Sequence, residues 1–160
     1  MRITVAAIGK LRSGPERALC DDYFDRARRA GKSLGFSGPD LIEREAPKGL
    51  SGPKRQAREG ALLLEALPEG AHIAALDERG DNIGTERFAA ALARRRDAGT
   101  PAVAFLIGGA DGHGEEIRAR AGQILSFGAA TWPHMLARAM LAEQLYRAMT
   151  ILAGHPYHRS

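Results

Sequence analysis

Short apolar runs alternate with longer amphipathic segments along the first two thirds of this chain. Four such runs are typical of strands, and they occupy residues 3–8, 41–45, 71–76 and 103–107. Segments with a helical spacing of apolar residues separate them, at residues 15–30, 51–68 and 85–98. This order predicts an α/β fold in which crossover helices join the strands of a parallel sheet.

Capping residues give the expected ends of these helices. Ser13 and Glu16 form a capping box, so we expect the first helix to begin at residue 15. Gly31 is expected to end that helix, and the segment after it is expected to be loose up to residue 40. Thr85 is expected to cap the third helix.

A glycine-rich loop follows the most apolar strand. The run at 103–107 reads as a strand that is buried on both faces, and it stops at the adjacent glycines Gly108 and Gly109. Glu115 and Glu116 then open a short helix that reaches about residue 121. Open α/β sheets bind small molecules at the carboxyl ends of their strands, so we expect this loop to form the functional site.

The last third of the chain is dominated by one long helix. After a strand stub at 124–127 and a loop at 128–132, the helix runs from about Pro133 to Ala153. Its apolar residues fall on two nearly opposite sides, typical of a helix that packs on the sheet with one side and on a partner subunit with the other. A central core helix within one domain is the alternative. Arg138 lies within the core-facing stripe and therefore needs an anion.

Length and composition limit the number of domains and the kind of protein that this chain can be. The 160 residues suffice for a single domain over 1–160, with 44% apolar and 26% charged residues. Cys20 is the only cysteine, which excludes a disulfide framework and favours the cytoplasm. Its neighbours Asp21 and Asp22 are expected to raise its pKa. No apolar run approaches the roughly 18 residues needed to cross a membrane, so we expect a cytoplasmic protein without a membrane partner.

Two segments rich in basic residues could contact a nucleic acid, but each also has an explanation that needs no such partner. The net charge is +4, and the run at 94–96 is either a solvated helix end or a nucleic-acid contact. The end of the chain holds His155, Tyr157, His158 and Arg159, which can contact phosphate, stack on a base and exchange a proton. A frayed terminus of chance composition is the alternative for this tail.

Familiar nucleotide and metal motifs do not account for the glycine loop. The loop lacks the Gly-Lys-Ser/Thr of a P-loop, and no Gly-x-Gly-x-x-Gly follows the first strand. His155 and His158 lack a third and fourth ligand at sensible spacing, so we expect no metal site. No nucleophile and base are paired, which argues against covalent catalysis.

Five motifs occurring in order resemble the RlmH family of SPOUT-class methyltransferases. They are Phe-Leu-Ile-Gly-Gly-Ala-Asp-Gly at 105–112, Leu-Ser-Phe at 125–127, Thr-Trp-Pro-His at 131–134, Glu-Gln-Leu-Tyr-Arg-Ala at 143–148 and the terminal His-Pro-Tyr-His-Arg. The resemblance starts at residue 3 and covers nearly the whole chain. It implies a SPOUT-type α/β fold with a C-terminal trefoil knot, a homodimer, and S-adenosylmethionine as cofactor. The implied reaction is methylation of N3 of a pseudouridine in helix 69 of 23S rRNA, in assembled 70S ribosomes.

The same resemblance implies the cofactor-binding positions. Carried over by motif, they are Leu76, Gly108, Phe127, Gly128, Ala129, Ala130, Thr131 and Trp132. Loops at the carboxyl ends of neighbouring strands can recognise adenine through backbone groups and need glycine where the ligand approaches, which agrees with these positions.

The implied reaction requires a group that accepts the imide proton and groups that bind phosphate or the imide anion. An imide nitrogen must lose its proton before or during methyl transfer, and our candidates for the base are His155 and His158. Arg138 and Arg159 are the candidates for holding phosphate or stabilising the imide anion. A nucleic-acid-binding protein without catalysis and a nicotinamide-dependent oxidoreductase are the alternatives.

Overall fold

The structure, a computed structural model that describes residues 1–157, is an α/β fold around one parallel sheet. Its strands are β1 (Arg2–Ile8), β2 (Ser37–Arg44), β3 (His72–Asp81), β4 (Ala102–Ile107) and β5 (Gln123–Leu125). Its helices are α1 (Pro15–Lys32), α2 (Gly52–Leu64), α3 (Thr85–Asp97), α4 (Glu115–Arg120) and α5 (His134–Leu152). The strand order is β2-β1-β4-β3-β5 and every pairing is parallel, which confirms the predicted fold class. The trefoil knot stays a prediction.

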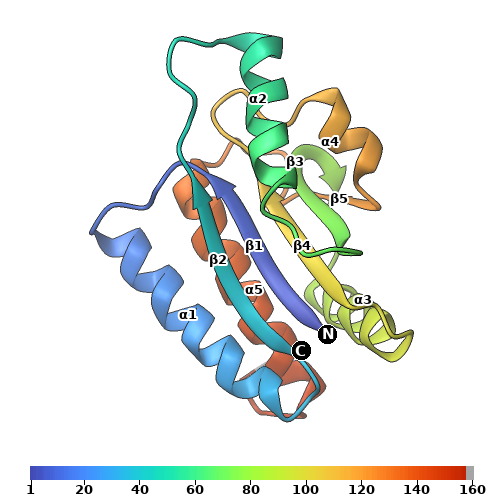
Figure 1. Ribbon diagram of the computed structural model, residues 1–160. Helices are drawn as coiled ribbons and strands as arrows, with labels where there is room; N and C mark the ends of the chain where they lie inside the picture. Colours follow the sequence, from blue (N-terminus) through green and yellow to red (C-terminus); the bar gives the residue numbers. More distant parts are fainter. Residues whose placement is uncertain (158–160) are drawn as a thin grey trace.

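Helices cover both faces of the sheet (Figure 1). On one face α5 packs between α1 and α3, and their apolar residues join those of β1 and β4 in the larger core. On the other face α2 and α4 cover a smaller core that contains Leu63 and Ile117. Since all of β4 is buried, its continuous apolar run is what a central parallel strand requires.

The predicted sidedness of α5 is confirmed for the side that faces the sheet. Leu141, Leu145 and Met149 are almost completely buried. On the predicted second side, Leu136 is 38% exposed, as is its neighbour Met135, whereas Met140 is half-buried and Ile151 packs against the larger core. The exposed apolar surface of α5 is therefore confined to its first turn, and the partner subunit on this side stays a prediction.

The first helix begins at Pro15 as predicted, but two expected side-chain caps and one expected helix end are wrong. The N-cap of α1 is Gly14 and that of α3 is Gly84, and neither makes a side-chain capping bond. Thr85 is instead the first residue of α3, and its hydroxyl donates to the Gln144 side chain at 2.9 Å. Gly31 lies inside α1, where an added Cβ would come within 3.2 Å of Met149 and Phe36. Here tertiary packing, not helix termination, requires the glycine.

Two strands are longer than predicted, and one helix is shorter. β2 begins at Ser37, within the segment expected to be loose, because β1 provides a partner from Arg2 onward. β3 continues to Asp81 through the expected polar loop, since a register shift lets Asp81 pair with β5. α2 ends at Leu64, four residues before Pro68. Non-local pairing extends strands where the local pattern is polar.

The arginine run at the end of α3 is partly structural. Arg96 donates to the Leu34 carbonyl oxygen at 2.8 Å, and its guanidinium lies 5.1 Å from the centre of the Phe36 ring. Arg96 therefore connects α3 to the turn between α1 and β2. This contact accounts for Arg96 without a bound nucleic acid.

In the described part of the chain, no helix is long and apolar enough to cross a membrane.

Candidate active site at the carboxyl edge of the sheet

The main polar cleft lies where β3, β4 and β5 end. It encloses about 480 Å³ and is bordered by residues 76–79 of β3, by the glycine loop after β4, and by the loop between β5 and α5. Three segments that are far apart in the sequence therefore meet at one edge of the sheet.

Seven of the eight predicted cofactor positions line this cleft. They are Leu76, Gly108, Phe127, Gly128, Ala130, Thr131 and Trp132. Ala129 belongs to the same loop, is exposed, and is not among the residues that line the cleft. The structure thus brings together positions that the sequence could place only one by one.

The loop from 126 to 132 is closed by its own hydrogen bonds. The Gly128 N–H donates to Ser126 Oγ at 3.1 Å, and the Trp132 indole N–H donates to the Phe127 carbonyl oxygen at 3.3 Å. Gly128 has a φ of 101°, in the region that favours glycine. Because the indole is tied back to the loop and remains 44% exposed, it borders the cleft without filling it.

The amino-terminal half of α2 holds the glycine loop in place. Gln56 Nε2 donates to the Asp111 carbonyl oxygen at 2.6 Å, and the Gly52 N–H donates to the Asp111 carboxylate at 3.2 Å. Glu59 is only 2% exposed, and a Cβ on Gly109 would lie 2.6 Å from its carboxylate. The loop can approach α2 this closely only because Gly109 has no side chain.

Different glycines of this loop serve different needs. Gly112 has a φ of 71°, so its conformation favours glycine. A Cβ on Gly108 would meet the backbone of Gly112 at 3.1 Å and His113 Nδ1 at 3.3 Å, so crowding rather than turn geometry limits this position. His113 is 2% exposed, and its Nε2 contacts the Leu106 carbonyl oxygen at 3.2 Å. Its ring therefore packs between the end of β4 and the glycine loop. Burial lowers the pKa of His113, which keeps its ring neutral.

One end of the cleft is charged. Arg118 of α4 donates from Nε and Nη2 to Asp77 Oδ2 at 3.2 and 3.0 Å. Burial alone would raise the pKa of Asp77, but the Arg79 N–H and the Arg118 guanidinium outweigh it and hold the pKa below its usual value. Both residues line the cleft, and the sequence analysis missed both. The polar segment directly after a strand was the available signal for Asp77.

His134 is a second residue of the cleft that the sequence analysis passed over. It is the first residue of α5, is half-buried, and lines the cleft. Burial and the neighbouring Arg138 lower its pKa, so its imidazole is neutral at neutral pH. Its place in the Thr-Trp-Pro-His motif was the signal that could have identified it.

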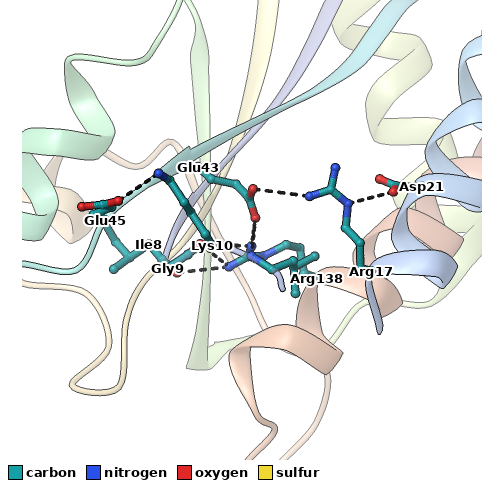
Figure 2. Close-up of polar contacts among 9 residues, drawn as sticks. Ile8, Gly9, Lys10, Arg17, Asp21, Glu43, Glu45 and Arg138 are labelled. Carbon is teal, nitrogen blue, oxygen red and sulfur yellow. Dashed lines mark hydrogen bonds and ion pairs between the residues drawn. The ribbon is translucent and has the colours of Figure 1, made fainter. Parts of the chain in front are cut away.

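Arg138, a predicted catalytic residue, is bound to groups of its own chain. Its side chain is completely buried, and Nη1 donates to Glu43 Oε1 at 2.6 Å while Nη2 donates to the Ile8 carbonyl oxygen at 3.1 Å. Figure 2 shows Glu43 between Arg138 and Arg17. Burial lowers the pKa of Arg138, and the Glu43 carboxylate opposes this shift. The anion that Arg138 needs is therefore supplied from within the chain, and Arg138 is not among the residues lining the cleft.

The described part of the tail begins at the opposite end of α5 from the cleft, and Tyr157 folds back so that its hydroxyl donates to Glu143 Oε1 at 3.3 Å. His155 is exposed, its N–H donates to the Thr150 carbonyl oxygen at 2.9 Å, and its Nδ1 accepts from the Tyr157 N–H at 3.2 Å. Within α5, Arg147 Nε donates to Glu143 Oε1 at 2.8 Å. His158 and Arg159, two of the predicted catalytic residues, lie outside the described residues.

The lone cysteine lies away from this chemistry. Cys20 is buried in α1, and burial raises the pKa of its thiol to about 11. The predicted direction of this shift is confirmed, with burial a larger cause than the neighbouring carboxylates.

Comparison with known proteins gives a consistent result. Residues 1–158 match the family described as "Predicted SPOUT methyltransferase". The chain is 52% identical over 160 residues to ribosomal RNA large subunit methyltransferase H of Hyphomonas neptunium (strain ATCC 15444), covering 100% of both chains. It is 55% identical over 159 residues to the protein of the same name from Dinoroseobacter shibae (strain DSM 16493 / NCIMB 14021 / DFL 12), covering 99% of each.

A solved structure has a similar fold. It is that of a probable methylase family protein from Haemophilus influenzae Rd KW20, at a TM-score of 0.51 and 16% identity, covering 99% of this chain and 70% of that one.

The Arg138–Glu43 pair predicts a large difference between two neighbouring glutamates. Glu43→Ala leaves a buried guanidinium without its carboxylate, and we expect the free energy of unfolding to fall by about 3–5 kcal/mol. Glu45→Ala is the matched control, because Glu45 pairs with Lys10 on the surface, and it should change stability far less. Urea denaturation at pH 7 measures both, and similar small losses would show that Arg138 does not depend on Glu43.

The contact between the glycine loop and α2 predicts coupling between Gly109 and Glu59. Gly109→Ala places a methyl group against the buried carboxylate and should destabilise the fold by about 1–3 kcal/mol. In the double variant with Glu59→Ala the clash is removed, so the combined loss should be smaller than the sum of the two single losses. Additive losses in thermal or urea unfolding would contradict this contact.

Proposed function

The chain belongs to the SPOUT methyltransferase family, and on that premise we propose that it transfers a methyl group from S-adenosylmethionine to ribosomal RNA. The proposed target is N3 of a pseudouridine in helix 69 of 23S rRNA, in assembled 70S ribosomes in the cytoplasm. The observation that carries the proposal is the cleft in which seven of the eight expected cofactor residues meet at the carboxyl edge of the sheet.

The residues of the cleft fit the proposed cofactor. Leu76 and Phe127 supply apolar walls, and the glycine loop lets its backbone lie close to a ligand. When bound, S-adenosylmethionine supplies an electrophilic methyl group on a sulfonium. The loop from 126 to 132 is held by its own hydrogen bonds before any ligand arrives, which limits the ordering that binding must impose.

We assign removal of the proton from the imide N3 to a histidine. His134 is neutral, half-buried and in the cleft, so it can accept a proton near neutral pH within the same chain. His155 and His158 of the tail remain candidates, and Arg159 remains the candidate for holding phosphate. Arg138 is not assigned a direct role, because its Nη1 and Nη2 are occupied by Glu43 and backbone carbonyl oxygens and its side chain does not line the cleft.

The position of His155 supports a homodimer with shared sites. His134 lies in the cleft at the start of α5, whereas His155 follows the other end of the helix, and the two ends are about 27 Å apart. A His155 that takes part in the reaction therefore acts in the cleft of a partner. The exposed apolar side of α5 at Met135 and Leu136 favours such a partner.

A methylation assay tests the reaction and its substrate. We expect methyl transfer from labelled S-adenosylmethionine to 70S ribosomes that lack the modification, and much less transfer to free 23S rRNA. A methyl group on N3 blocks the base-pairing edge, so primer extension should stop at helix 69. Calorimetry should show one S-adenosylmethionine per chain and no binding of NAD. Absence of both transfer and binding would overturn the proposal, and a stop elsewhere in the RNA would overturn the proposed target.

Mixed dimers test whether the active sites are shared. Gly108→Val crowds the glycine loop, and removal of residues 155–160 deletes the tail, so each homodimer should be inactive. A mixed dimer of the two variants has one site with both defects and one intact site, and we expect about half of the wild-type activity. Co-expression with two affinity tags provides the mixed dimer, and mass spectrometry confirms it. No recovery of activity would mean that each chain forms its own site.

A further inference from the structure

The charged end of the cleft is organised around one arginine. Arg118 projects from α4, and Asp77, whose side chain is only 6% exposed, holds it through Nε and Nη2. Asp77 is itself fixed, because its Oδ1 accepts the Arg79 N–H at 3.0 Å. The guanidinium is therefore bound to β3, and its orientation does not depend on α4 alone.

The guanidinium keeps donors for a ligand. Among the described residues, both hydrogen bonds of Arg118 use Oδ2 of Asp77, and no partner of Nη1 is found. The Arg118 side chain is 35% exposed and lines the cleft. A planar guanidinium with a free edge is suited to binding a carboxylate, and the ion pair with Asp77 sets the plane of that edge in advance.

The surroundings of Arg118 carry the opposite charge as well. Asp77, Glu78 and Asp111 line the same cleft, and Asp111 comes from the glycine loop on its other side. Arg79 lines the cleft as well, so the cleft offers two guanidinium groups and three carboxylates. Groups of both signs in one cleft are complementary to a zwitterion, with a carboxylate and an ammonium close together. The apolar residues Leu76, Leu125 and Phe127 border the same cavity and suit the uncharged part of such a ligand.

We propose that Arg118, oriented by Asp77, binds the α-carboxylate of the amino-acid end of the cofactor, with the cleft carboxylates facing the ammonium group. This inference rests on the proposed function, because it takes S-adenosylmethionine to be the ligand. It assigns the direction in which the ligand lies: the amino-acid end toward α4 and the adenosine toward the 126–132 loop.

Two ligands that differ only at the amino-acid end test this assignment. S-adenosylhomocysteine carries the α-carboxylate and ammonium, whereas 5′-methylthioadenosine keeps the adenosine and thioether without them. For Arg118→Gln we expect the affinity for S-adenosylhomocysteine to fall about tenfold or more, as for loss of a charge-assisted hydrogen bond. The affinity for 5′-methylthioadenosine should change by less than about threefold. Calorimetry measures both, with circular dichroism to check that the variant is folded.

Two further variants separate ligand binding from a purely structural role. Arg120→Gln is the matched control, because Arg120 lies one half-turn away on α4, pairs with Glu116 and does not line the cleft. It should leave both affinities unchanged. Arg118→Lys keeps the positive charge and should recover part of the affinity for S-adenosylhomocysteine.

The outcomes distinguish this inference from the proposed function. A selective loss for S-adenosylhomocysteine supports the assignment. An equal loss for both ligands would mean that Arg118 has only a structural role in the cleft. No loss for either ligand would mean that the guanidinium binds another anion, such as an RNA phosphate. Both results would overturn this inference without contradicting the proposal that the protein binds S-adenosylmethionine. Failure of the wild-type protein to bind either ligand would instead overturn the proposed function, and the inference with it.

Discussion

The buried ion pair between Arg138 and Glu43 is the interaction on which the arrangement of this molecule depends. It joins α5 to the carboxyl ends of β1 and β2, and the same guanidinium also binds the Ile8 and Gly9 carbonyl oxygens. A buried charge is unfavourable unless its partners are correctly placed, so the pair allows few positions of α5. Because His134 begins that helix and the loop from 126 to 132 leads into it, fixing α5 also fixes one wall of the cleft.

The opposite wall depends on a different kind of contact. α2 binds the glycine loop through Gln56 and Gly52, and the buried Glu59 lies against Gly109 without space for a side chain. One wall is therefore set by charge pairing and the other by close backbone approach. Both supports come from outside the loops themselves, which agrees with a site whose shape is largely formed before a ligand binds.

Family and geometry contribute different parts of the functional picture. Membership of the SPOUT methyltransferases gives the class of chemistry, and relatives that match the full chain carry a ribosomal RNA methyltransferase name. The geometry adds what each residue can do: Arg138 is internal, His134 faces the cleft with a lowered pKa, and the tail starts at the far end of α5. A residue's presence in a motif therefore does not by itself give it a chemical role.

The sequence alone determined the parallel α/β class and the long last helix and predicted the glycine loop as the candidate site, because each depends on local periodicity or on the chain order of strand, glycines and helix. Its motifs also gave the proposed cofactor positions. Only the tertiary structure decided the partner of Arg138, which lies 95 residues away, the role of Gly31 inside α1, and the extension of β3 to Asp81. It alone paired Asp77 with Arg118, across 41 residues. Such features depend on which distant segments meet, and a local pattern of apolar and polar residues does not contain that information.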